Sequence, residues 1–366
     1  MRASLNVRAF LAAALAAALV VQPALACTGI MLKTTDGSLV HGRTVEFGFT
    51  IESSIAVVPR GQAFVGKTPS GDGLKYNAKY GAVGAIAFTD IKLLDGMNET
   101  GLAVGAFYFP TFAKYTPVTP DNQSKGLSPA DFPNWILTQF ASVDEVRKAV
   151  QAGEAIITPT VLDKWGTEAP PFHYVVYDKT GASIVIEPIE GRLVMHDNPL
   201  GVMTNSPSYD WHMTNLRNYI SLSPNNASPV KIDGETFLPL GQGSGMIGLP
   251  GDFTPPSRFV RAAIFTATAT PSKTAEAGVD QVFHILNNFD IPVGASRDVS
   301  DGVVHNDYTM LTTARDPQSL RYYYKSYEDQ TIRMVDLKQQ DLNAKGIKMV
   351  STKGPQPVAD MTSQVK

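Results

Sequence analysis

The only cysteine of this 366-residue chain, Cys27, follows a segment with the features of an export signal. Two arginines near the N-terminus precede an apolar run over residues 10–21 that is rich in Ala and Leu. Ala24 and Ala26 then complete the A-x-A pattern after which a signal peptidase cuts. We therefore expect residues 1–26 to be a cleaved signal peptide. The mature chain would begin at Cys27 and be periplasmic or secreted.

A chain that begins at Cys27 carries a thiol and a free α-amine on one residue. The thiol titrates near ~8.5 and the amine near ~8, so a proton can pass between them close to neutral pH. Such a residue holds both a nucleophile and its base. Two other interpretations stay open here. In the first, Cys27 is a buried cysteine without chemistry. In the second, it is the lipidated cysteine of a lipoprotein, although Ala24 stands where lipoprotein signals normally have Leu.

The bulk composition argues against several classes of partner. With 31 basic and 34 acidic residues and a net charge of −3, the chain shows no basic stripe for nucleic acid. No apolar run after the signal reaches the ~18 residues of a membrane span, so we expect no membrane contact after signal removal. One cysteine excludes an internal disulfide framework. The six histidines show neither H-x-x-x-H spacing nor cysteine partners, so we expect no metal and no cofactor.

The segment after Cys27 predicts a β-hairpin, because two apolar stretches flank Asp36-Gly37, a strong signal for a two-residue turn. A turn centred on this pair places Cys27 opposite Glu46, which brings a carboxylate near the terminal amine. Strict alternation then puts Arg43 on the other face of the hairpin from Cys27.

Later segments alternate between strand and helix patterns. Strands at both ends with helices between them favour one α+β domain over two. We expect this domain to span residues 27–349 and residues 350–366 to form a loose polar tail. The sequence predicts a three-stranded meander at His173–Tyr177, Ser183–Glu187 and Leu193–His196, and a fourth strand at Gly201–Thr204. It predicts that helices start at Ser142–Glu145 and at Pro255-Pro256.

Taken together, several short motifs make the chain resemble the choloylglycine hydrolase family, which includes bile salt hydrolases and penicillin V acylases. The resemblance spans nearly all of the mature chain. It implies the αββα sandwich of N-terminal nucleophile hydrolases, two antiparallel sheets with helices outside, and a possible homotetramer. The motifs are Cys27-Thr28-Gly29, Gly42-Arg43-Thr44, Asp95–Glu99, Asn198-Pro199, Thr204–Pro207, Gly248–Asp252 and Ser257-Arg258-Phe259.

The resemblance also implies a site of six residues that act through charge and hydrogen bonding. Cys27 is the nucleophile, Arg43 lies beside its thiol, and Glu46 stands where the family usually has Asp. The oxyanion donors are the backbone N–H of Tyr108 and the side chain of Asn205. Arg258 is a second arginine of the site. A nearby arginine favours the thiolate form of a cysteine. No histidine is required.

These residues predict an exported hydrolase that cleaves a linear C–N amide bond of a small molecule through a thioester. Tyr108 stands where bile salt hydrolases usually carry Asn. We therefore expect penicillin V or N-acyl homoserine lactones as substrates ahead of conjugated bile salts. Two alternatives remain, a cysteine glutaminase of amidotransferase type and a non-catalytic periplasmic binding protein or lipoprotein. A free Cys27 at the mature N-terminus would favour the enzyme.

Overall fold

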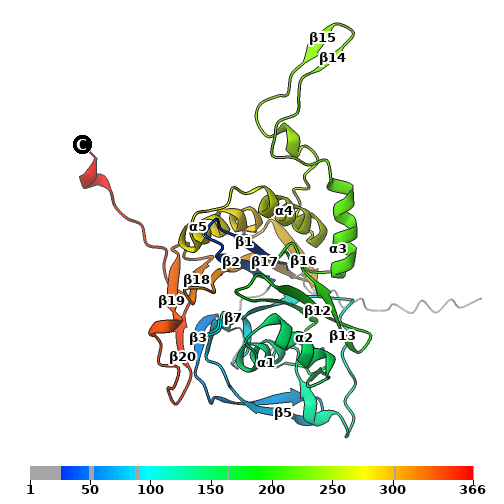
Figure 1. Ribbon diagram of the computed structural model, residues 1–366, viewed down its shortest axis with the longest axis vertical. Helices are drawn as coiled ribbons and strands as arrows, with labels where there is room; N and C mark the ends of the chain where they lie inside the picture. The colour runs from blue at the N-terminus through cyan, green and yellow to red at the C-terminus, as the bar shows by residue number, and fades with distance from the viewer. Residues whose placement is uncertain (1–25, 49–52, 87–90, 163–164, 301, 366) are drawn as a thin grey trace, which may run out of the picture.

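The computed structural model describes residues 26–48, 53–86, 91–162, 165–300 and 302–365. Residues 1–25 of the expected signal peptide lie outside these ranges, and Ala26 is described as part of the chain that continues into Cys27. Two antiparallel sheets form the centre of the molecule (Figure 1).

The first sheet has six strands and carries the N-terminal hairpin. Its path is β1 (Cys27–Lys33), β2 (Leu39–Phe47), β17 (Val303–Asp316), β18 (Arg321–Ser326) and β19 (Arg333–Asp336), with β16 (Ser296–Ser300) paired to β17.

The second sheet has eight strands and contains the predicted meander, which is confirmed. Its path is β13 (Arg192–Asp197), β12 (Ser183–Ile189), β11 (Phe172–Tyr177), β8 (Ala103–Tyr108), β7 (Leu93–Asn98), β6 (Ala82–Ile86), β3 (Ser54–Val58) and β20 (Lys348–Ser351).

Helices cover the outer faces of both sheets (Figure 1). The helices α4 (Pro255–Thr268) and α5 (Ala275–Leu286) pack on β1, β2 and β17. The helix α1 (Phe132–Gln139) packs on β7 and β8, and α2 (Val143–Gln151) lies beside it. This order of layers confirms the αββα sandwich.

Smaller elements connect these layers. Two antiparallel hairpins pair β4 (Ala63–Thr68) with β5 (Gly71–Asn77) and β14 (Val230–Ile232) with β15 (Glu235–Phe237), and β9 (Gly126–Leu127) pairs in parallel with β10 (Ile156–Ile157). A further helix is α3 (Tyr209–Asn215). The 3-10 turns are η1 (Gln123–Lys125), η2 (Leu216–Tyr219), η3 (Ser244–Met246), η4 (Asn287–Phe289), η5 (Leu337–Gln339) and η6 (Thr362–Gln364).

Local signals in the sequence explain where the helices begin. The Ser142 hydroxyl oxygen accepts a hydrogen bond from the N–H of Glu145 at 3.2 Å, which confirms the predicted N-cap of α2. The helix α4 begins at Pro255, where the missing N–H costs no intrahelical bond. This start places Arg258 in the first turn of α4, at the end of the helix nearest the site described below.

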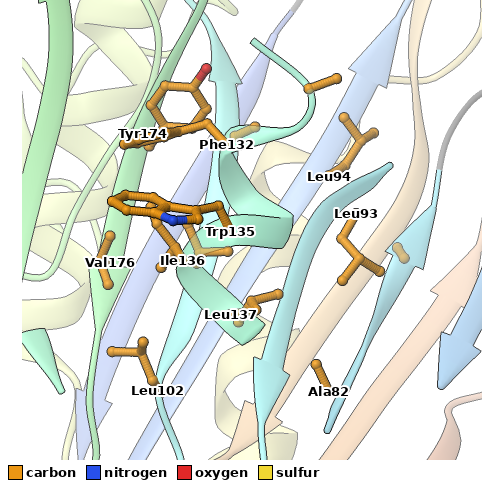
Figure 2. Packing of buried hydrophobic residues seen from close by; sticks show 14 of the residues in the cluster. Ala82, Leu93, Leu94, Leu102, Phe132, Trp135, Ile136, Leu137, Tyr174 and Val176 are labelled. Carbon is orange, nitrogen blue, oxygen red and sulfur yellow. The ribbon is translucent and has the colours of Figure 1, made fainter. Parts of the chain in front are cut away.

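The core between α1 and the eight-stranded sheet is built from buried aromatic and aliphatic side chains. Figure 2 shows Trp135 and Phe132 of α1 stacked toward Tyr174 and Val176 of β11. The ring centroids of Phe132 and Tyr174 lie 4.8 Å apart. Each fully buried side chain of this size stabilises the fold by roughly 1.5–3 kcal/mol.

The turn between β1 and β2 differs from the prediction. The N–H of Gly37 donates to the Thr34 carbonyl at 3.1 Å, and Gly37 has a φ of +85°. The N–H of Thr34 in turn donates to the Ser38 carbonyl at 2.9 Å. The connection is therefore a three-residue loop over 35–37, a tight turn followed by a left-handed glycine, rather than a two-residue turn.

This loop shifts the hairpin register by one residue and so reverses the expected faces. Cys27 lies opposite Val45, not opposite Glu46, and Gly29 lies opposite Arg43. Since Cys27 and Gly29 share a face, Arg43 lies on the same face as Cys27. Our prediction that strict alternation separates the two was wrong.

Two further segments differ from expectation. Residues 201–204 form no strand, and their one ladder contact is an isolated bridge between Met203 and Gly29. The strand β20 pairs Val350 and Ser351 with β3, so ordered pairing continues past residue 349, where we expected the domain to end. The chain beyond β20 runs away from the sheets (Figure 1).

Residues 220–251, called the arm below, extend from the end of η2 away from both sheets and carry β14 and β15 (Figure 1). A hairpin of two three-residue strands is marginally stable on its own. Seven apolar side chains of the arm are more than half exposed: Ile220, Val230, Ile232, Phe237, Leu238, Leu240 and Ile247. The arm therefore exposes apolar side chains along much of its length.

None of the helices in the described ranges combines the length and the apolar character needed to cross a bilayer. The same ranges contain no group of three or more His, Cys, Asp or Glu side chains placed to hold a metal ion. The charged groups around Cys27 are instead arginines and a glutamate, buried between the two sheets and α4.

Candidate active site

The start of β1 places Cys27 beneath α4, next to the segment that contains Asn205. Cys27 is only 2% exposed. Main-chain hydrogen bonds of 2.7 and 3.0 Å between Gly29 and Met203 bring the Asn205 segment alongside β1. Residues 178 positions apart in the sequence thereby meet at one point.

Asn205 connects the main predicted groups. Its Oδ1 accepts hydrogen bonds from the Cys27 main-chain nitrogen at 2.8 Å and from Nη2 of Arg258 at 2.7 Å. Its Nδ2 donates to the Tyr108 carbonyl at 2.8 Å. An amide nitrogen carries two hydrogens, so this bond leaves the second hydrogen for another acceptor. The structure therefore brings these four predicted residues together.

Arg258 reaches the site from the first turn of α4 and is 1% exposed. Its Nε donates to the Phe253 carbonyl at 2.8 Å, which fixes the side chain. Its Nη1 donates to the Cys27 carbonyl and, at 3.0 Å, to the Thr28 hydroxyl. Burial lowers the pKa of Arg258 to about 10, which leaves the guanidinium charged at neutral pH.

Arg43 enters the site from β2 and inserts where the ladder between β7 and β8 opens. Its Nη1 donates to the Ala106 carbonyl at 2.6 Å and to the Leu94 carbonyl at 3.4 Å. Its guanidinium carbon lies 4.1 Å from the centre of the Phe107 ring. Gly29 lets this ring approach β1, because an added Cβ would lie 2.7 Å from the Phe107 ring. Arg43 is thus held rigidly on the face that carries Cys27.

Opposing effects act on the pKa of the Cys27 thiol. Burial raises this pKa above its ordinary value and is the largest effect. The positive charge of Arg43 lowers it, the carboxyl of Glu46 raises it, and the N–H of Glu46 and the charge of Arg258 lower it. Both arginines therefore favour the thiolate, as the resemblance implies, while burial favours the neutral thiol.

Glu46 is buried and faces β17 rather than the nitrogen of Cys27. Its Oε1 accepts a hydrogen bond from the Thr309 hydroxyl at 3.0 Å, and Thr309 lies directly opposite it on β17. Met310 forms a bulge beside this pair. Burial raises the pKa of Glu46 to about 7, against the opposing charge of Arg258.

Tyr108 ends β8 beside Asn205. The N–H of Phe109 donates to the Pro171 carbonyl at 2.6 Å. Because hydrogen-bonded and non-hydrogen-bonded pairs alternate along an antiparallel ladder, the next pair, Tyr108 and Phe172, is not hydrogen-bonded. The main-chain N–H and carbonyl of Tyr108 therefore point away from β11. The Tyr108 carbonyl accordingly reaches Asn205. In an extended strand the N–H of a residue points to the same side as its carbonyl, so the Tyr108 N–H also faces Asn205.

Three polar residues behind Asn205 were missed among the predicted site residues: His173, Glu187 and His212. The ring of His173 contacts the Thr204 carbonyl at 3.1 Å, and that of His212 contacts the Asn205 carbonyl at 2.8 Å. The available signal was a histidine and a glutamate inside otherwise apolar strands, since such residues are rarely fully buried unless paired.

Proteins similar to this chain carry the names of amide hydrolases and acylases. Residues 27–350 match the family described as linear amide C–N hydrolases, choloylglycine hydrolase family. A bile salt hydrolase/transferase of Clostridium perfringens is 34% identical over 325 residues, which cover 88% of this chain and 95% of that protein. A crystal structure of a conjugated bile acid hydrolase from the same species gives a TM-score of 0.81 at 31% identity, covering 91% of this chain and 99% of that one. A penicillin V acylase of Pectobacterium atrosepticum is 30% identical over 290 residues, or 75% of this chain and 70% of that protein.

Proposed function

Because the chain belongs to the choloylglycine hydrolase family of linear amide C–N hydrolases, we propose that Cys27 cleaves the substrate amide once its bond to Ala26 has been cut. The observation that carries this proposal is the position of Asn205, hydrogen-bonded to both the Cys27 nitrogen and the Tyr108 carbonyl. A nucleophile, its base and an oxyanion donor are thereby within one hydrogen-bonded group.

In the proposed reaction the free α-amine of Cys27 takes the thiol proton and the sulfur bonds to the amide carbonyl carbon. The carbonyl oxygen becomes an oxyanion, which accepts hydrogen bonds from the second Nδ2 hydrogen of Asn205 and the N–H of Tyr108. Such donors are typically worth ~2.7–4 kcal/mol each. The C–N bond then breaks, the proton passes from the α-ammonium to the leaving amine, and a thioester remains.

Water completes the cycle. The α-amine takes a proton from the attacking water, the oxygen bonds to the thioester carbon, and the C–S bond breaks. The acid leaves, and the proton returns to the sulfur. Arg43 and Arg258 support both steps, because each stabilises negative charge on the sulfur through its positive charge.

For the substrate, the relatives favour conjugated bile salts over the acylase substrates that Tyr108 led us to expect. The bile salt hydrolase is 34% identical and covers 88% of this chain, against 30% and 75% for the penicillin V acylase. One position weighs less than similarity along the whole chain. We therefore rank the glycine or taurine amides of bile acids first.

Penicillin V and long-chain N-acyl homoserine lactones remain the second candidates, and one observation favours them. Tyr108, which resembles the penicillin V acylases at this position, lies at the predicted oxyanion site with a buried side chain. Its ring centroid lies 6.2 Å from that of Trp165. Two aromatic rings at this point suit an apolar acyl group.

The test is kcat/KM of the purified mature chain for glycocholate, penicillin V and a long-chain acyl homoserine lactone, with Cys27→Ala as the control. We expect glycocholate to exceed both others by about tenfold and the control to be inactive. A tenfold preference for either other substrate would reverse the ranking. Hydrolysis of none of the three, or full activity of the control, would contradict the proposed function.

We also propose that the mature protein is exported and begins with an unmodified Cys27. Intact mass spectrometry of protein from the periplasmic fraction should match a chain that starts at this residue. A mass increased by a diacylglyceryl group would instead identify a lipoprotein with no free thiol for catalysis.

A further inference from the structure

A buried polar cluster lies directly behind Asn205, on elements that hold none of the other predicted site residues. His173 on β11 and Glu187 on the neighbouring β12 are both fully buried, and His212 on α3 is 1% exposed. Burying polar side chains at this level costs free energy unless each is paired. The hydrogen-bond partners of the two histidines therefore indicate which part of the chain the cluster stabilises.

The acceptors around His173 determine where its protons lie. Its Nε2 is 3.1 Å from the Thr204 carbonyl, which can only accept, so Nε2 carries a hydrogen. Its Nδ1 is 3.2 Å from Oε1 of Glu187. Although burial alone would raise the pKa of Glu187, its interactions with His173, His196 and the N–H of Tyr209 lower it to about 2. Glu187 is therefore ionised, and its Oε1 pairs with Nδ1 of His173.

His212 makes the corresponding contact one residue further along. Its Nε2 lies 2.8 Å from the Asn205 carbonyl and therefore also carries a hydrogen. Its ring stacks on Phe259 of α4, with centroids 4.6 Å apart and planes inclined by 9°. Burial lowers the pKa of His212 to about 4, so the ring is neutral at physiological pH and donates through this one nitrogen.

We propose that His173 and His212 are positioning residues for Asn205. One donates to the carbonyl before Asn205 and the other to the carbonyl of Asn205 itself. Together they hold the main chain on both sides of the Asn205 Cα, so the side-chain amide keeps its direction toward the oxyanion position. This inference rests on the proposed function, in which that amide is an oxyanion donor.

Such an anchor acts where main-chain pairing is absent, because the ladder with β1 stops before Asn205. The last main-chain contacts are those between Gly29 and Met203, and Thr204 and Asn205 belong to no strand. The two imidazoles replace the missing ladder partners. A displacement of about 1 Å at a catalytic group can cost ~10²-fold in rate, so loss of this anchor should be visible in kcat.

Two substitutions at one position separate an anchor from a purely structural role. In His173→Gln the amide nitrogen takes the place of Nε2 and can still donate to the Thr204 carbonyl, but Glu187 loses its partner at Nδ1. In His173→Asn the amide nitrogen takes the place of Nδ1, which keeps a donor for Glu187 and loses the bond to Thr204. Replacing the exposed His284 by Asn controls for loss of an imidazole.

We expect opposite orders for activity and stability. His173→Asn should lower kcat by ~10–100-fold with KM changed less than ~3-fold, while His173→Gln keeps more of kcat but has the lower melting temperature. The rate of Cys27 alkylation by iodoacetamide should stay near that of wild type in both. The same comparison at His212, Gln against Asn, should give the same order of activity.

Higher kcat in His173→Asn than in His173→Gln would overturn the proposal, because activity would then follow stability. Crystal structures of both variants give a readout without turnover. The 2.8 Å contact between Asn205 Nδ2 and the Tyr108 carbonyl should persist in the Gln variant and be lost in the Asn variant. Its persistence in both would refute the positioning role. An inactive wild type would count against the proposed function alone.

Discussion

Replacing Glu46 by Gln should remove a pH dependence from the free energy of unfolding. Burial raises the pKa of Glu46 from its ordinary value of 4.5 to about 7, so the folded chain binds this proton more tightly than the unfolded chain does. A raised pKa contributes stability that is fully present below the unfolded value. That stability is lost as the pH rises through about 7.

The size of the effect follows from the shift. At ~1.36 kcal/mol per pH unit, a change from 4.5 to about 7 corresponds to about 3 kcal/mol. Gln keeps the length of the side chain and an oxygen for the Thr309 hydroxyl, but it does not ionise. The stability of Glu46→Gln relative to wild type should therefore rise by about 3 kcal/mol between pH ~4.5 and ~8.

The assay is urea unfolding followed by circular dichroism at several pH values, on a chain that keeps the bond between Ala26 and Cys27, as in the structure. The exposed Glu276 on α5 provides the matched control, because Glu276→Gln is the same replacement at the surface, where a charge near a helix N-terminus is worth at most about 1 kcal/mol. If Glu46→Gln runs parallel to wild type, Arg258 neutralises the buried carboxylate completely and our reasoning about its burial is wrong.

Four other outcomes follow from the site and the arm. Cys27→Ala should abolish turnover with the fold intact. Iodoacetamide should inactivate wild type, and mass spectrometry should find one label per chain. Full activity after labelling would exclude Cys27 as nucleophile. A chain expressed as Met-Ala26-Cys27 that keeps both preceding residues should be inactive, because an amide nitrogen accepts no proton, and turnover by it would refute the terminal-amine mechanism. Asn205→Ala should lower kcat by ~100-fold or more with little change in KM, whereas a change confined to KM would make it a substrate-binding group. We propose a homotetramer assembled through the arm, so Phe237→Asp with Leu240→Asp should lower the mass measured by light scattering, and an unchanged mass would contradict this.

Signals that act within a few residues were readable from the sequence. The capping serine of α2, the proline start of α4 and the strands of the meander all appear where the pattern predicts them. The turn after β1 was not readable, because Asp-Gly suits both a two-residue turn and the left-handed end of a three-residue loop. One residue of loop length decided the face of Arg43.

The site divides in the same way. The resemblance named the residues that meet at Cys27, but neither it nor the pattern gave the hydrogen bonds that join them. Spacing along a chain does not reveal that Arg43 would bridge two carbonyls at an open ladder, or that Glu46 would bond across to Thr309. These contacts depend on how two sheets stack, and no local periodicity encodes that.

The surroundings of the bond between Ala26 and Cys27 bear on when the proposed cleavage can occur. Ala26 is only 9% exposed, and its carbonyl accepts a hydrogen bond from the N–H of Glu46 at 3.0 Å. A peptidase needs an accessible, extended segment, so we propose that the cut comes before the hairpin closes or while it opens. The proposed cleavage would exchange an amide N–H for an amine beside the same acceptor, Oδ1 of Asn205. It would add the proposed base to a site whose other hydrogen bonds already exist in the chain that includes Ala26.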